Sequence, residues 1–290
     1  MATAKLRLVC ISDTHNAFPG AGFTLPSGDV LIHAGDLTNQ GSLAEIEKAM
    51  AWIKRANFAA KLVVAGNHDL SLDAKYGLKY PEGWKVLPEE GETCREVMKG
   101  TEGVTYLEHE SAEVEVKGVK LKVFGSPYSP DRGGQNWAFQ YLTEEAGELW
   151  SAVPEHVDVL VTHTPSSLGL DESKHWRDGG CDVLARRVRE IRPRLHVFGH
   201  CHEGRGAEVV HWEEPAENGE FRRTDWRDPG VANKKQSLFD LTGARGGQSL
   251  TAGADSALVN VSVMARSWGQ GGKAFNKPIV VDIDIPLKHD

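Results

Sequence analysis

Cysteine is scarce in this chain, with four in 290 residues, and no two of them show the short paired spacing of a zinc ribbon or a redox motif. No stretch approaches the roughly 20 apolar residues that a membrane-spanning helix needs. The first residues lead directly into an apolar strand, without the charged start and apolar core of a secretory leader. We therefore expect a cytoplasmic protein with reduced thiols and no membrane partner.

Basic residues are also in deficit, since 33 Lys and Arg face 41 Asp and Glu and leave a net charge of −8. Proteins that bind nucleic acid polymers use basic patches that displace counterions. This composition therefore disfavours a nucleic acid partner and favours a small molecule. With 40% hydrophobic residues, a chain of this length can bury one large core. We predict a single domain over residues 1–290.

What the chain does have is a series of short apolar runs that each end in a polar cluster. The runs are rich in β-branched residues and have the length of buried strands. In chain order they are Leu6–Ile11 before Asp13-Thr14-His15, Val30–Ile32 before Gly35-Asp36, Leu62–Val64 before Gly66-Asn67-His68-Asp69, Val157–Val161 before Thr162-His163, and Leu195–Phe198 before Gly199-His200-Cys201-His202. Ligands of open α/β sheets bind beyond the carboxyl ends of strands. The five clusters are thus candidates for one site.

The clusters supply oxygen and nitrogen donors that suit a divalent first-row metal ion. Carboxylate, amide oxygen and imidazole, without a thiolate run, argue against a structural zinc or iron–sulfur site and favour Mn, Fe or Zn. The candidate ligands are Asp13, His15, Asp36, Asn67, His163, His200 and His202. One catalytic ion takes about four protein groups, so two ions that share Asp36 fit better. Such a pair, about 3.5–4 Å apart, can hold a hydroxide and clamp a phosphoryl group for in-line attack.

In this order the clusters Asp-x-His, Gly-Asp, Gly-Asn-His-Asp, Thr-His and Gly-His-x-His resemble those of the calcineurin-like metallophosphoesterases over roughly two thirds of the chain. Residues 125–127, 136–139 and 194–200 further resemble the small metallophosphoesterase-domain proteins related to class III cyclic nucleotide phosphodiesterases. The resemblance implies an α/β fold, a four-layer α/β/β/α sandwich in which two mixed sheets are flanked by helices.

The resemblance also implies a role for each candidate residue. Asp13, His15, Asp36 and His202 would bind one metal, and Asp36, Asn67, His163 and His200 the other, with Mn the expected ion in vitro. His68 would be the catalytic general acid or stabilise the phosphoryl oxygens, a task that suits histidine near neutral pH. Asn67 and His68 would also contact the substrate. Six histidines outside the motifs are expected to have ordinary structural partners: His33, His109, His156, His175, His196 and His211.

Other patterns predict the flanking elements. Residues 43–56 and 181–191 have the apolar spacing of amphipathic helices, the first with a capping box at Ser42 and Glu45. Residues 112–116 and 119–124 alternate about a Lys-Gly turn, which indicates a hairpin. The apolar runs at 258–264 and 278–285 are predicted to add the last strands to the two sheets.

Residues 213–257 differ from the rest because they are polar and rich in glycine. We predict a long excursion from the domain there. Loops of this length in a compact domain are often lids or mobile segments, and a disordered surface insertion is the alternative.

Arginine is absent from two places where protein phosphatases of this superfamily use it to grip a monoester. Residues 37–41, after Asp36, and 64–66, before Asn67, contain none. Less fixed positive charge favours a diester monoanion over a monoester dianion, although Arg132 could supply charge. We expect a phosphodiesterase for small phosphodiesters, with cyclic nucleotides as the first candidates and Trp137 as an aromatic face for the base. The alternatives are a phosphomonoesterase and a non-catalytic metal-binding scaffold.

One position departs from the family pattern. Many relatives place an acidic residue three positions after the bridging aspartate, beside the catalytic histidine, and this chain has Asn39. An amide oxygen can accept the imidazole N–H of His68, but it stabilises an imidazolium less than a carboxylate does. If the Asn39 side chain lies there, Asn39→Asp should favour the acid form of His68. Asp69 is the candidate substitute for the missing carboxylate.

Overall fold

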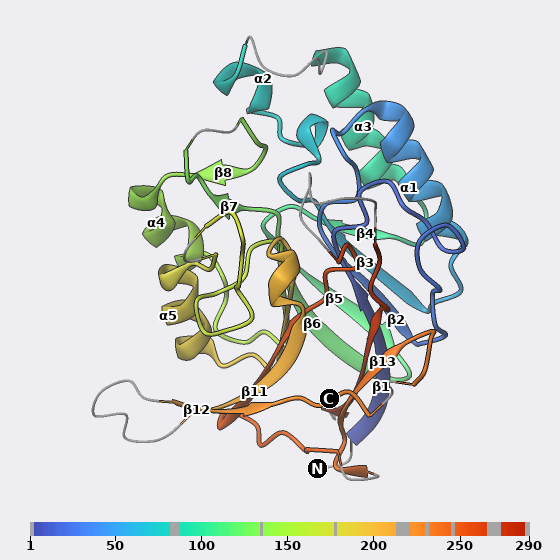
Figure 1. Ribbon diagram of the computed structural model, residues 1–290, viewed down its shortest axis with the longest axis vertical. Helices are drawn as coiled ribbons and strands as arrows, with labels where there is room; N and C mark the ends of the chain where they lie inside the picture. Colours follow the sequence, from blue (N-terminus) through green and yellow to red (C-terminus); the bar gives the residue numbers. More distant parts are fainter. Residues whose placement is uncertain are drawn as a thin grey trace.

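Two large mixed β-sheets carry the fold in the computed structural model (Figure 1), which describes residues 3–81, 88–133, 136–176, 179–212, 221–229, 232–244, 247–265 and 274–287. The first sheet has the spatial order β13 (Ser237–Leu241), β15 (Ile279–Pro286), β1 (Thr3–Ile11), β2 (Val30–Ala34), β3 (Ala60–Val64), β4 (Thr105–Leu107). The second has the order β12 (Phe221–Asp225), β11 (Gly206–Trp212), β14 (Asp255–Asn260), β10 (Leu195–Phe198), β9 (Val159–Thr162), β6 (Val119–Ser126), β5 (Glu110–Val116). The α/β class with two mixed sheets is thus confirmed.

Parallel pairing sets where the strands end. β1, β2, β3 and β4 run parallel to one another, while β15 runs antiparallel to β1. In the second sheet β6, β9, β10 and β14 run parallel, and the predicted hairpin forms the antiparallel pair β5 and β6. Within each sheet, the carboxyl ends of the parallel strands therefore lie at one edge, and the polar clusters begin there.

The core between the sheets follows from alternation along the strands. In β1, Leu6 and Leu8 point into the cluster between the two sheets, whereas Val9 and Ile11 point to the outer face. The inner cluster also takes residues such as Leu121 from the second sheet. Each large apolar side chain buried this way contributes about 1.5–3 kcal/mol.

Helices cover both outer faces and complete the four layers (Figure 1). The helices α1 (Leu43–Arg55) and α3 (Pro88–Gly100) pack on the first sheet, and α4 (Ala146–Ser151) and α5 (Asp182–Ile191) pack on the second. The predicted capping box of α1 is present. The Ser42 side chain accepts the Glu45 backbone N–H, and the Glu45 side chain accepts the Ser42 backbone N–H. Shorter elements are α2 (Tyr76–Lys79), β7 (Ser129–Pro130), β8 (Gln140–Tyr141) and 3₁₀ turns at Leu70–Leu72, Thr143–Glu145 and His202–Gly204.

Parts of residues 213–257, the segment predicted as a long excursion, belong to the two sheets. β12 pairs with β11 at an edge of the second sheet, and β13 pairs with β15 at an edge of the first. In β13, Ser237, Phe239 and Leu241 are buried and the residues between them are partly exposed. This strand signal is only five residues long, and polar, glycine-rich flanks obscured it. Residues 213–220, 230–231 and 245–246 lie outside the described residues.

Two further expectations concern the whole chain. All four cysteines are free and buried. Within the described ranges, no helix combines the length and the apolar character that crossing a membrane requires.

Candidate metal centre

The predicted ligands sit on tight turns directly after the strands. Asp13 and His15 follow β1, Asp36 follows β2, and His200 follows β10, and all four have a positive φ, between 41° and 67°. Such a backbone costs about 1–3 kcal/mol per residue and persists where the surroundings enforce it, often at functional sites. The turns aim side chains from different strands into one space.

Three motif glycines are required because other ligands pass close to their backbone. A Cβ on Gly35 would collide with the His163 ring, and a Cβ on Gly66 would collide with the Asp36 carboxylate. At Gly199 it would overlap the Ser12 hydroxyl. Each glycine therefore holds two strand ends in contact across the site.

Asp13, His15 and His202 form one half of the centre. His202 Nε2 lies 3.3 Å from Asp13 Oδ1 and 3.4 Å from His15 Nε2. One ligand atom from each residue lies within 4.8 Å of the other two. Three buried donors that face one another in this way can surround a cation.

Asn67, His163 and His200 form the other half. Asn67 Oδ1 is 2.8 Å from His163 Nε2 and 2.8 Å from His200 Nδ1. The His163 Nδ1–H donates to Ala34 O at 3.0 Å, which leaves Nε2 with a lone pair toward the centre. The backbone thus selects the tautomer of His163 that can bind a metal.

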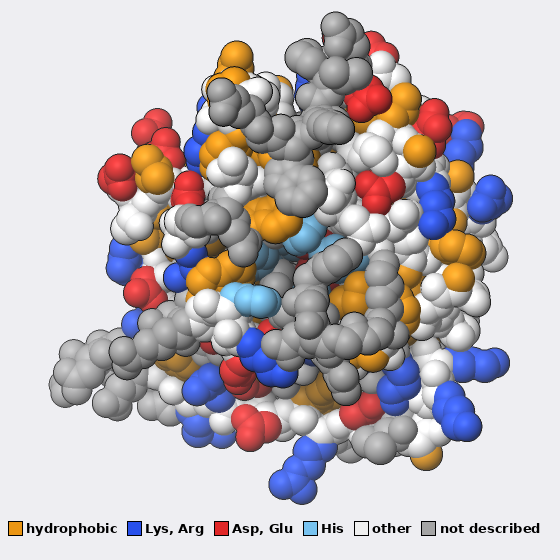
Figure 2. All heavy atoms as spheres, turned by 45° about the horizontal axis from the view of Figure 1, so that its top comes forward, with side chains coloured by type: hydrophobic (Ala, Val, Ile, Leu, Met, Phe, Trp, Pro, Cys, Tyr) orange, Lys and Arg blue, Asp and Glu red, His pale blue; other side chains and the backbone are white. Residues whose placement is uncertain are grey.

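Asp36 connects the two halves through separate oxygens. Its Oδ2 lies 3.7 Å from His15 Nε2, and its Oδ1 lies 3.4 Å from His163 Nε2. All seven predicted ligands are therefore gathered at one place. Figure 2 shows histidine side chains, in pale blue, in the hollow on this face of the molecule.

The electrostatics of the cluster match the needs of a metal ion. Burial, together with neighbouring histidines, holds the pKa values of His15 and His200 well below their usual range, so both rings are neutral. Burial raises the pKa of Asp13, but His202 and the other histidines outweigh it and hold that pKa well below normal. Neutral imidazole and ionised carboxylate are the metal-binding forms. The donor set fits divalent ions.

His68 is positioned beside the centre by its backbone and by Asn39. Its backbone N–H donates to Asp36 Oδ1 at 2.9 Å, and its Nδ1–H donates to the backbone carbonyl of Asn39 at 2.8 Å. The Asn39 side chain points elsewhere and donates to Glu45 Oε1 at 2.9 Å. The prediction that Asn39 lies beside His68 is thus correct, but the contact is made by the backbone carbonyl of Asn39 and not by its side chain.

Asp69 does not replace the missing carboxylate. It accepts the backbone N–H groups of Gly66 and Thr38 and the Thr38 hydroxyl, at 2.7–2.9 Å, and so joins the loops after β2 and β3. Burial and the nearby charge of Asp36 raise the pKa of Asp69 to about 7. Its role is to fix the two loops.

Tryptophan rings cover two of the histidines. Trp137 packs on His68 with ring centres 4.1 Å apart, and Trp176 stacks on His200 at 5.1 Å and 17°. The guanidinium of Arg132 lies 5.8 Å above the Trp176 ring. The sequence indicated Trp137 as a candidate for base stacking, but nothing local in the sequence predicted that the two tryptophans contact His68 and His200.

Histidines outside the motifs have structural partners where the contacts are described. His33 Nε2 lies 3.0 Å from the Thr14 hydroxyl, and His196 Nε2 lies 2.8 Å from the Thr162 hydroxyl. His109 bridges Ser126 and a backbone carbonyl. Among the described residues, none of these histidines joins a group that could hold a metal.

Comparison with known proteins agrees with this geometry. The family model of calcineurin-like phosphoesterases matches residues 6–204. A UPF0046 protein of Caenorhabditis elegans is 38% identical over 70% of this chain and 66% of its own length. Human metallophosphoesterase domain-containing protein 1 is 37% identical over 69% of this chain and 61% of its own length. The aligned part is thus less than two thirds of either relative.

Two further matches give weaker support for the family. The probable rhamnogalacturonate lyase C of Emericella nidulans is 42% identical over 72% of this chain, but the match spans only 18% of that protein. One crystal structure covers 70% of this chain and 86% of its own at a TM-score of 0.50 and 13% identity, which shows the fold alone. With the family model over more than half of its residues and its motifs gathered at one centre, the chain belongs to the calcineurin-like phosphoesterases.

Proposed function

We propose that the protein is a metal-dependent phosphodiesterase that hydrolyses small phosphodiesters at a two-metal centre. The observation that carries this proposal is the position of Asp36, with one carboxylate oxygen toward each group of ligands. Asp13, His15 and His202 would hold one ion with Asp36, and Asn67, His163 and His200 the other. Bound Mn, Fe or Zn would polarise the phosphoryl group and activate water.

His68 is the residue best placed to serve the leaving oxygen. Because Nδ1–H donates to the Asn39 carbonyl, Nε2 is an acceptor in the neutral ring and a donor in the imidazolium. Trp137 packs against the ring and limits its rotation. His68 can thus deliver a proton from a fixed direction.

The charge around the centre supports a diester. In the described part of the chain, Asp13 and Asp36 form ion pairs with histidines and with no Lys or Arg. Arg132 donates to the Gly180 carbonyl at 2.8 Å and lies over Trp176, so part of its donor capacity is already used. Among the described residues, no Lys or Arg pairs with the carboxylates of the centre, so a second phosphate charge has no bidentate partner in that part of the chain. The flat rings of Trp137 and Trp176 favour substrates with a base, and cyclic nucleotides are the first candidates.

A rate comparison on metal-loaded protein tests the proposal. An aryl phosphodiester, the matching monoester, and 2′,3′ and 3′,5′ cyclic nucleotides are assayed with the same ion. We expect a higher kcat/KM on the diester than on the monoester, because kcat/KM reports transition-state binding. A preference for the monoester would establish the phosphomonoesterase instead. Metal binding without turnover of any ester would favour the scaffold.

A further inference from the structure

The segment that follows β14 reaches the metal centre although it lies outside the family-matched residues 6–204. Ser12 N–H donates to Val261 O at 3.1 Å, and Val263 N–H donates to Ser12 O at 3.0 Å. These bonds align Ser262 with Ser12, directly beside Asp13. A piece of chain 249 residues away from Asp13 in sequence thus contacts the centre through Ser262.

Ser262 and Ser12 bind the same oxygen of Asp13. The Ser262 hydroxyl is 2.7 Å and the Ser12 hydroxyl 2.5 Å from Asp13 Oδ2. The other oxygen, Oδ1, is the one near His202 Nε2, at 3.3 Å. The two hydroxyls therefore fix the rotation of the carboxylate so that Oδ1 faces the metal ligands.

Ser262 has one hydroxyl proton and two acceptors within reach, since Asn260 Oδ1 is 2.9 Å away. Asn260 Oδ1 already accepts the Ser262 backbone N–H at 3.2 Å. A hydrogen bond to a charged acceptor is about twice as strong as a neutral one. The proton therefore goes to Asp13.

Asn260 contacts a second part of the centre, the loop that carries His200 and His202. Its Nδ2 donates to Cys201 O at 2.8 Å and to Leu170 O at 2.9 Å. Cys201 lies between His200 and His202, so the amide holds the loop that carries both ligands. Asn260 and Ser262 are both fully buried, and their polar groups have partners.

We infer that Ser262 and Asn260 are positioning residues of the metal centre, which tune its metal affinity through Asp13 and the loop at Cys201. The inference rests on the proposed metal-binding function. Partners of this kind typically change metal affinity by about 10–100-fold when they are removed. Without the Ser262 hydroxyl, Asp13 Oδ2 keeps the Ser12 hydroxyl and a longer contact at 3.2 Å with the His200 backbone N–H, which also reaches Oδ1 at 3.2 Å. The carboxylate then gains freedom to rotate.

Calorimetric titration of metal-stripped protein with Mn²⁺ tests the inference. We expect Ser262→Ala to weaken Mn²⁺ binding by about 10–100-fold and Ser262→Thr, which keeps a hydroxyl, to weaken it less. The visible spectrum of Co²⁺-loaded protein should also change in Ser262→Ala, because the ligand geometry at Asp13 changes. Circular dichroism of the metal-free proteins checks that each variant is folded.

Ser256→Ala is the matched control. Ser256 is a fully buried serine of β14, the strand that precedes Ser262, but its hydroxyl accepts from Trp212 Nε1 at 2.9 Å. This variant should lose some stability and bind Mn²⁺ as the parent does. Parental affinity and an unchanged Co²⁺ spectrum in Ser262→Ala, or an equal loss in Ser256→Ala, would overturn the inference. Absence of metal binding in the parent itself would instead refute the proposed function.

Discussion

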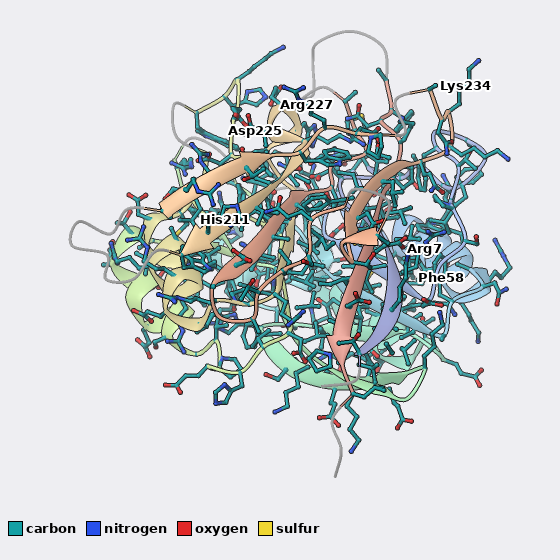
Figure 3. All side chains as sticks on the ribbon, turned by 90° about the horizontal axis from the view of Figure 1, so that it is seen from below. Arg7, Phe58, His211, Asp225, Arg227 and Lys234 are labelled. Atoms are coloured by element: carbon teal, nitrogen blue, oxygen red, sulfur yellow. The ribbon has the colours of Figure 1, made fainter. Side chains whose placement is uncertain are left out.

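The two ends of β14 carry similar residues in different settings. Asp255, at its start, accepts from His211 Nδ1 at 2.7 Å, and the other nitrogen of His211 lies 2.9 Å from the Thr224 hydroxyl. Asn260, at its end, supports the metal centre. Figure 3 shows His211 from the side opposite the strand ends that carry that centre. One end of the strand thus holds a partly buried pair of histidine and carboxylate, and the other end adjoins the buried pair of Asp13 and His202 in the metal centre.

His211 and the histidines of the metal centre differ in what their second ring nitrogen contacts. In His211 both nitrogens have protein partners, so no lone pair is left for a metal. In the centre, nitrogens of His15, His163 and His202 approach one another and the carboxylates at 3.3–3.7 Å. Register explains the contrast, because His211 and Asp255 are direct cross-strand neighbours in β11 and β14. The comparison teaches that a histidine is a candidate metal ligand when its ring nitrogen meets donor atoms of several other residues. A position beside a carboxylate is not enough.

The largest expected effect is the difference between Asp36→Asn and Asp255→Asn. Asp36→Asn keeps the size of the side chain and removes the charge that the two proposed metals would share, so metal content should fall and turnover should drop by at least about 10²-fold. Asp255→Asn should leave both unchanged and lower the free energy of unfolding by about 1–3 kcal/mol, the cost of weakening a partly buried hydrogen bond to a charged group. Elemental analysis, rate assays and urea denaturation measure these. Full activity of Asp36→Asn with one ion per chain would contradict the shared-carboxylate model.

The second-largest effect is expected for the difference in turnover between His68→Ala and His211→Ala. His68→Ala should lower turnover by about 10²–10⁴-fold, the scale of one acid–base group, with metal content intact. His211→Ala should affect stability alone. One His68 nitrogen lies within 4.8 Å of ligand atoms of His15 and Asp36, so metal content decides its role. Loss of metal together with rate in His68→Ala would make His68 a ligand.

The smallest effect is expected for Asn39→Asp. The backbone carbonyl of Asn39 holds His68, so the substitution should leave the basic limb of the pH–rate profile in place. It should destabilise the fold by about 0.5–1.5 kcal/mol, because it removes the amide donor to Glu45 and adds a like charge. An upward shift of the basic limb, at parental metal content, would show that the side chain reaches His68 in solution.

The same variant has a pH signature. Burial raises the pKa of Glu45, but hydrogen bonds from Asn39, Ser42 and Gln40 prevail and lower it. A carboxylate with a lowered pKa adds stability above its unfolded pKa of about 4.3, and this stability is lost as pH falls through the folded pKa. Asn39→Asp removes one of these donors, so its acid unfolding should begin at a higher pH. Denaturation midpoints between about pH 3 and 7 measure the shift.

Much of the fold and the site could be predicted from local patterns. The apolar runs before Asp13, Asp36 and Asn67 are strands, and the capping box of α1 is where the sequence indicates it. β12 and β13 were missed because each is five residues long and lies between polar, glycine-rich stretches, so only pairing with an existing sheet edge makes it a strand.

The sequence by itself determined which residues are candidate ligands and on which strand ends they lie, because strand periodicity and the motifs can be recognised without the tertiary structure. Tertiary structure alone decided which oxygen of Asp13 faces the centre, which atom of Asn39 holds His68, and that Ser262 takes part at all. The physical reason is that a hydrogen bond depends on direction and on competition among acceptors within about 3.5 Å. Both are set by segments that meet only when the two sheets pack together.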